Sequence, residues 1–208
     1  MRTPSRARGA ALVTMLFLML ALLMMSLSAA RAALASAKSA RCERDRQVAH
    51  AAAEAALRDA ERDIDGAAGP ASPRTAIFAA PDSAAFAGRC GDSGDAERAG
   101  LCRAGGAAPP AWQAADLAGA AGVEYGRFTG RMLPTGAATL PAAAPRYLVE
   151  LLPGAQPLFR ITALGVGADP ATLVVLQSYY RRAAGGVPGK RLGWREIANW
   201  PALHRGAS

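Results

Sequence analysis

The chain has 208 residues, a formal net charge of +8 and a hydrophobic share of 51%. Its 3 cysteines and 2 histidines show no metal-ligand spacing, and it has neither a glycine-rich phosphate loop nor a paired-carboxylate arrangement. These features argue against an enzyme, and we expect no catalytic residue, no metal and no cofactor.

Residues 10–30 form an uncharged segment rich in leucine and methionine, and about 20 such residues are enough to cross a bilayer. Arg2, Arg6 and Arg8 precede it without an acid, so the positive-inside rule places the N-terminus in the cytoplasm and the rest outside. A cleaved secretory signal also begins in this way. We favour a retained segment, because the apolar run is longer than a usual signal core and residues 10–65 contain no proline or glycine.

Residues 31–65 repeat apolar side chains at the spacing of one helix face. The positions on this face are Ala49, Ala52, Ala53, Ala56, Leu57, Ala60 and Ile64. The opposite face is expected to be charged, with Glu54 one turn before Arg58. Gly66 and Pro70 should end the helix. The stripe alone would also fit a short core helix, but joined to the apolar segment it predicts one long helix.

Residues 66–122 form the expected loop region. Within it, residues 67–110 are rich in alanine, glycine, proline and serine and indicate a loop with one short helix. Cys90 and Cys102 lie in this region, and an oxidising space outside the membrane would allow a disulfide between them. Such a bond would contribute about 3 kcal/mol in the chain-entropy model. A zinc site is the alternative, but a single cysteine pair offers too few ligands. Cys42, on the helix, is expected to be a small buried thiol without chemistry.

The segment "GDSGD" at residues 91–95 resembles the nucleophile segment of trypsin-like serine proteases. That chemistry needs a histidine base next to the serine. The two histidines are His50, on the N-terminal helix, and His204, near the C-terminus. Because neither lies in a suitable strand context, we interpret the segment as a solvated loop.

Four short runs after residue 122 are rich in β-branched and aromatic residues and are bounded by glycine and proline. They are residues 123–130, 146–152, 158–166 and 172–180. The sequence "GADP" at 167–170 predicts a hairpin between the last two. Together they predict an antiparallel sheet, and the concentration of large side chains after Val123 places the core there.

The C-terminal tail is basic and contains aromatic residues. Its charged residues are Arg181, Arg182, Lys190, Arg191, Arg195 and Arg205 against one acid, Glu196. Tyr179, Tyr180, Trp194 and Trp200 lie among them. This mixture can bind single-stranded nucleic acid, but no nucleic-acid motif supports that partner. We favour a solvated strand edge or a subunit contact.

Several segments resemble one family. The leader "RTPSRARG", followed by an apolar helix that becomes amphipathic, resembles a type IV pilin precursor. The helix segment "RDRQVAHAAAEAALRDAE" is similar to the corresponding stretch of PilX-type minor pilins, as are "PRYLVELL", "LFRITALGVGADPATLVVLQSYYRR" and "GKRLGWREI". The resemblance implies an α+β, pilin-like fold, in which the long helix packs on a C-terminal antiparallel sheet. It also implies cleavage between Gly9 and Ala10 by prepilin peptidase, followed by methylation.

We therefore divide the chain into a leader at 1–9, a helix at 10–65 that is transmembrane at 10–30 and amphipathic at 31–65, a loop region at 66–122, and a sheet region with a basic tail at 123–208. The resemblance implies a minor pilin that helps to initiate type IV pilus assembly. Its partners would be other minor pilins, the major pilin, prepilin peptidase, the inner-membrane assembly machinery and, before assembly, membrane lipid. It would reside in the inner membrane, with its C-terminal domain periplasmic, and in the pilus.

The chain departs from most pilins at two positions after the expected cleavage. The first mature residue is Ala10 instead of phenylalanine, and the fifth is Thr14 instead of glutamate. In pilins, as the resemblance implies, the fifth-position glutamate neutralises the free amine of a neighbouring subunit. Thr14 has no carboxylate and can bond back to the helix carbonyl one turn earlier, so we expect this subunit to tolerate a site without that amine, at or near the pilus tip. The alternatives are a minor pseudopilin of type II secretion and a bitopic, membrane-anchored periplasmic protein.

Overall fold

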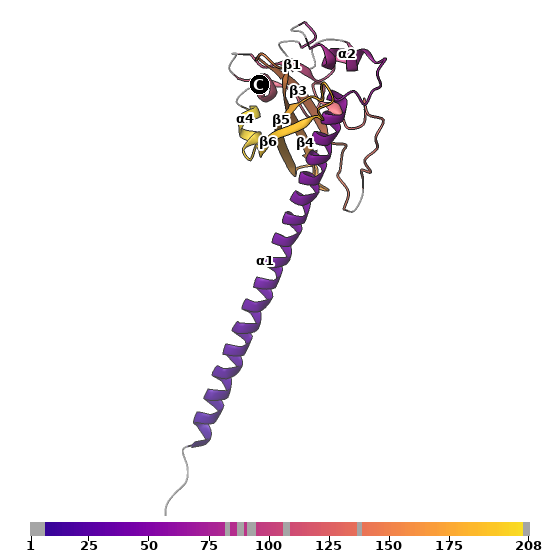
Figure 1. Ribbon diagram of the computed structural model, residues 1–208. Coiled ribbons are helices and arrows are strands. Elements are labelled where there is room, and N and C mark those ends of the chain that lie inside the picture. The colour runs from indigo at the N-terminus through magenta and orange to yellow at the C-terminus, as the bar shows by residue number, and fades with distance from the viewer. Residues whose placement is uncertain are drawn as a thin grey trace, which may run out of the picture. The chain divides into compact units, whose positions relative to one another are not determined.

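The computed structural model describes residues 7–81, 84–86, 90, 95–105, 109–136 and 139–205 (Figure 1). The expected leader residues 1–6 and residues 91–94 of the protease-like segment lie outside the described residues. The chain divides into two compact units, Met1–Arg44 and Asp45–Ser208.

The helix α1, Ala7–Ile64, has 58 residues and contributes to both units. Alanine, leucine and arginine are its most frequent residues, and all three have high helix propensity. Gly66 follows the helix with a left-handed φ of 95°, and the Ala67 N–H donates to the Arg62 carbonyl at 2.9 Å. This is the glycine-dependent way of ending a helix, so the expected helix and its glycine stop are confirmed.

The second unit contains a six-stranded, mostly antiparallel sheet. Its main path runs in the order β1 (Leu101–Arg103), β3 (Arg146–Leu152), β4 (Leu158–Val166), β5 (Leu173–Arg181) and β6 (Lys190–Glu196). The short strand β2, Val123–Glu124, pairs with β3 outside this path. The pairing of β1 with β3 is parallel, and the other pairings are antiparallel.

The strands expected at 146–152, 158–166 and 172–180 correspond to β3, β4 and β5. The "GADP" hairpin is also confirmed, since the Gly167 N–H donates to the Thr172 carbonyl at 2.8 Å. The strand expected at 123–130 is wrong beyond Glu124. Gly126 has a positive φ of 83° and turns the chain there, which an extended strand would not allow.

Apolar clusters line both faces of the sheet. The C-terminal part of α1 packs on one face, where Phe159, Ile161 and Leu176 join the alanine face of the helix. The short helices α3 (Ala111–Ala114) and α4 (Trp200–Arg205) contribute to a second cluster with β-strand residues of the other face, and α4 follows β6 (Figure 1).

The expectation that the core lies after Val123 is incomplete. Region 66–122 contains the helix α2 (Pro73–Ala79) and the 3-10 helix η1 (Ala96–Arg98). It also supplies the buried residues Phe78, Phe86, Leu101, Trp112 and Leu117. These side chains complete the core because the sheet region alone does not cover both of its faces.

Candidate functional site: the N-terminal helix and the sheet it packs on

The first half of α1 is an apolar surface without a cover. Its large exposed side chains are Leu12, Val13, Met15, Leu16, Phe17, Leu18, Met19, Leu20, Leu22, Leu23, Met24, Met25 and Leu27. The helix is long and apolar enough to cross a membrane, with a mean hydropathy of 2.4 over its most apolar window. An apolar surface of this extent marks contact with lipid or protein.

The expected processing and assembly residues lie near the start of this helix. Gly9 and Ala10 belong to α1, which begins at Ala7. The Thr14 hydroxyl donates to the Ala11 carbonyl at 2.9 Å, which is the back-bond that we expected. Thr14 therefore needs no polar partner outside its own helix.

In the second unit, α1 approaches the sheet closely through small residues. The seven apolar positions expected on one face, from Ala49 to Ile64, are all buried. They meet β4 at Gly165, where an added Cβ would lie 2.0 Å from the Ala49 carbonyl oxygen and 2.4 Å from the Ala53 nitrogen. Only a residue without a side chain fits between the helix backbone and the strand.

The acidic residues of α1 hold the helix to the rest of the domain. We expected charge on the opposite face, but Asp59 and Asp63 are fully buried among the apolar residues, so that expectation is wrong for these two. Asp59 accepts hydrogen bonds from the Gly126 N–H and the Thr129 hydroxyl. Burial of a carboxylate is tolerated when such donors satisfy it.

Other acids bind both ends of the strands. Asp45 accepts hydrogen bonds from the Ala168 and Asp169 N–H groups at the β4–β5 hairpin, at 2.6 and 3.1 Å. A hydrogen bond from Thr172 is the main cause that lowers the pKa of Asp45. Further along the helix the acids pair with the strand ends. Glu54 and Glu61 bind Arg191 at 2.9 and 2.6 Å, and Asp65 accepts from the Tyr180 hydroxyl at 2.6 Å.

A buried ion pair joins α1 to α2. Arg74 and Asp63 are both fully buried, with 2.8 Å between Nη2 and Oδ2. The same guanidinium donates to the Glu97 and Ala99 carbonyls at 2.7 and 2.8 Å, and the Tyr147 hydroxyl donates to Asp63 at 2.9 Å. Burial raises the pKa of Asp63, and the positive charge of Arg74 opposes that rise. One arginine thus fixes three segments of the chain.

Cys90 and Cys102 form a disulfide with 4.6 Å between their Cα atoms. Cys102 is buried in β1, so the bond attaches Cys90 to the sheet. Cys42 is a free cysteine and is exposed, so its expected burial is wrong. The reason lies in the helix, because the buried face of α1 begins only at Ala49.

The remaining candidate residues have packing partners. The His50 ring meets the Trp194 ring edge-on, with 6.0 Å between the ring centroids, and the His204 ring stacks on the Trp200 ring, with 5.1 Å between the centroids. In the tail, Arg182 donates to the Ile64 carbonyl at 2.8 Å and Arg195 donates to Gln177. Within the described ranges, no group of three or more histidine, cysteine, aspartate or glutamate residues could hold a metal ion.

An α+β fold built on an N-terminal helix, with an exposed apolar first half and a second half packed on a mostly antiparallel sheet, is pilin-like. Two family comparisons agree with this class. A model described as PilX N-terminal matches residues 8–58, and one described as type IV pilus assembly protein PilX, C-terminal, matches residues 98–182. The chain belongs to the PilX family of type IV pilus assembly proteins. Neither a search of curated proteins nor a search of solved structures finds a match.

Proposed function

We propose that the chain is a minor pilin that helps to initiate type IV pilus assembly and occupies a site at or near the tip. The observation that carries this proposal is Thr14, which has no carboxylate and donates its hydroxyl to the Ala11 carbonyl. Residues 10–30 hold the protein in the inner membrane, and the domain that follows residue 65 lies in the periplasm. The protein acts by assembly and not by catalytic turnover.

The physical step is the transfer of an apolar helix from lipid to a bundle of helices. Lipid tails are as apolar as leucine, so the transfer gains little from the hydrophobic effect, and packing of small residues must supply much of the affinity. Residues 29–37 contain six alanines beside Arg31, Leu34 and Ser36, and side chains as small as alanine permit close approach of neighbouring helices. The partners are other minor pilins, the major pilin and the inner-membrane assembly machinery.

Cleavage between Gly9 and Ala10 is the first prediction that follows. The resemblance to pilin precursors implies that prepilin peptidase removes residues 1–9 and that the new N-terminus is methylated. Mass spectrometry of protein extracted from membranes should show a chain that begins at Ala10. Replacement of Gly9 by leucine should leave the precursor in the membrane and keep it out of filaments. A wild-type chain that begins near Arg31 would instead indicate a secretory signal peptide.

The position in the pilus gives the second prediction. In pilins, as the resemblance implies, the fifth-position glutamate neutralises the free amine of a neighbouring subunit in an apolar environment, where an unpaired charge is costly. A subunit with Thr14 tolerates a site without such an amine, and only the first subunit in the filament has that site. Immunogold labelling of the wild-type protein should therefore mark filament ends.

The variant Thr14→Glu should reduce the number of pili or move the label into the shaft. Thr14→Ser is the matched control, because serine keeps a hydroxyl that can bond to the same carbonyl, and it should behave as wild type. Even labelling along the shaft by the wild-type protein would contradict the tip assignment. The match to a pilus assembly family favours the pilus over type II secretion and over a bitopic periplasmic protein.

A further inference from the structure

The strand β6 ends the sheet, and in the described part of the chain no strand pairs with its outer edge. The Ile197 N–H donates to the Val175 carbonyl at 2.9 Å, so this residue faces β5. Hydrogen-bonded and non-hydrogen-bonded residues alternate along an antiparallel pair. Arg195 and Gly193 therefore also face β5, while the backbone N–H and C=O groups of Trp194 and Glu196 point outward.

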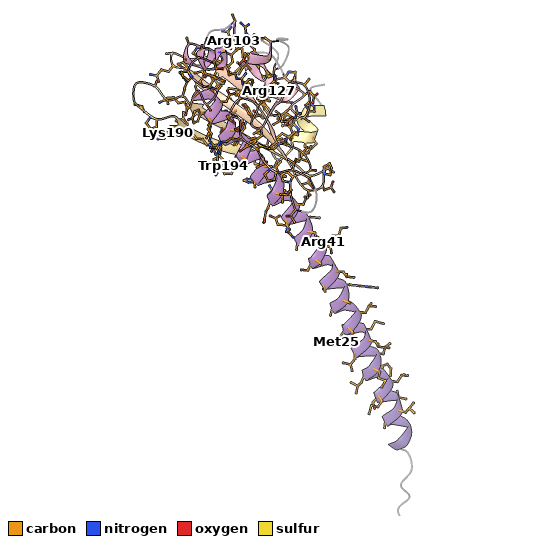
Figure 2. The ribbon with its side chains drawn as sticks, turned by 90° about the vertical axis from the view of Figure 1, so that its right-hand side faces the viewer. Met25, Arg41, Arg103, Arg127, Lys190 and Trp194 are labelled. Carbon is orange, nitrogen blue, oxygen red and sulfur yellow. A yellow bond between two sulfur atoms is a disulfide. The ribbon has the colours of Figure 1, made fainter. Side chains whose placement is uncertain are left out.

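Two large apolar side chains of this edge strand are exposed to solvent. Trp194 is 55% exposed and Leu192 is 47% exposed, whereas Trp112 and Trp200 are buried. Figure 2 labels Trp194 and Lys190 along the same flank of the domain. Exposed edge strands are templates for pairing with another chain. An exposed tryptophan beside unpaired backbone groups is therefore a surface that a partner can cover.

The face of β5 and β6 that points away from α1 carries exposed basic side chains. Arg181 and Lys190 are Cα partners across β5 and β6 and are both exposed. Like charges directly opposite each other destabilise a sheet, and among the described residues neither has an acid within ion-pair distance. Arg195 lies on this face too and donates to the neutral side chain of Gln177. Gly193 lies between these basic residues in β6, and the space beside it is open, since an added Cβ there would meet no atom within 4 Å.

We propose that the outer edge of β6 binds an extended, acidic segment of a partner protein as an added strand. The backbone groups of Trp194 and Glu196 would pair with the segment, as in other cases of β-strand addition. Its carboxylates would neutralise Arg181, Lys190 and Arg195, and an apolar side chain on its other face would cover Trp194. Trp194 lies on the sheet face that packs on α1, next to His50, and the three basic side chains lie on the opposite face.

That division favours a peptide over nucleic acid. A single nucleic-acid strand uses aromatic stacking and phosphate contacts along one groove. Here the exposed Trp194 ring and the basic side chains of Arg181 and Lys190 lie on opposite faces of the sheet. An extended peptide has side chains that alternate between two faces, so it can satisfy both faces together. The inference concerns the folded domain and holds whether or not the subunit sits at the pilus tip.

The test uses the full-length protein in detergent micelles and three probes. They are an end-blocked peptide of alternating valine and glutamate, the corresponding valine and lysine peptide, and single-stranded oligothymidine. The glutamate peptide should change the tryptophan fluorescence on binding and slow hydrogen exchange at the amides of Trp194 and Glu196. The double variant Arg181→Gln with Lys190→Gln should weaken its binding about tenfold, since it removes two exposed ion pairs.

The matched control is Arg103→Gln with Arg131→Gln, which makes the same change of charge at exposed positions away from β6 and should leave binding unchanged. The variant Trp194→Val keeps a strong strand former and should weaken binding without loss of the fold. Equal binding of the lysine peptide, binding without slower exchange at β6, or displacement of the peptide by oligothymidine would overturn the proposal. Because no pilus is needed, these outcomes are independent of the labelling experiment.

Discussion

Replacing Arg74 by methionine is expected to lower the free energy of unfolding by about 3–5 kcal/mol, the usual cost of removing one partner from a buried ion pair. Among the side chains that the structure describes, the Tyr147 hydroxyl would be the remaining donor to Asp63. The Glu97 and Ala99 carbonyls would lose the guanidinium that now binds them at 2.7 and 2.8 Å. Denaturant unfolding of the full-length protein in detergent, followed by tryptophan fluorescence, measures the loss.

The pH dependence of this loss has a definite sign. Burial already raises the pKa of Asp63, and Arg74 opposes the rise, so the folded variant should have a still higher carboxyl pKa. A raised pKa in the folded state favours stability at low pH and removes it as the pH rises. Relative to wild type at the same pH, the variant should therefore lose less stability at about pH 4 than at about pH 7.

Two further variants separate burial from charge. Arg98→Met removes an exposed pair, in which Arg98 lies 3.4 Å from Asp95, and should cost less than about 1 kcal/mol. Asp63→Asn combined with Arg74→Met should cost less than Arg74→Met alone, because no carboxylate remains buried without its cation. A loss below about 1 kcal/mol for the single Arg74 variant would show that this pair does not organise the loop region.

The sequence predicted the long helix and three central strands because each follows a local rule. An unbroken run without proline or glycine continues as a helix, and β-branched runs between turns form strands. The parallel partner β1 could not be predicted in this way. It has three residues and pairs with β3 at a separation of more than forty residues, for example Leu101 with Val149, and no local pattern encodes such a pairing.

The burial of two acids of α1 is predictable from the periodicity of the helix. Asp59 and Asp63 follow Ala56 and Ala60 by three residues, so both lie on the helix face that the apolar periodicity had already assigned to the core. Carboxylates in such a stripe predict buried donors elsewhere. The identity of those donors was not predictable, because Arg74 and Tyr147 come from separate segments that meet only in the folded domain.

Gly165→Val is expected to lower the free energy of unfolding by about 3 kcal/mol, at the upper end of the cost of overpacking. The added side chain would collide with backbone atoms of α1, at 2.0 and 2.4 Å from the first carbon alone. The flexible end of a side chain could move aside, but a helix backbone moves only as a unit. The helix would have to withdraw from β4, and its alanine face would lose contact with the sheet. Denaturant unfolding of the full-length protein in detergent would measure this change.

Gly193→Val is the matched control for this prediction, because Gly193 also lies in a strand and an added Cβ there meets no atom within 4 Å. Its effect should stay within about 0.5 kcal/mol, as for most surface substitutions. A Gly165 variant as stable as the Gly193 variant would show that α1 does not need close contact with the sheet.

If the prediction holds, the consequence extends to assembly. If the protein is the minor pilin proposed above, a domain that loosens from residues 49–64 would no longer follow the helix out of the membrane. The Gly165 variant should then enter filaments poorly, even though the proposed processing site and the apolar segment are unchanged.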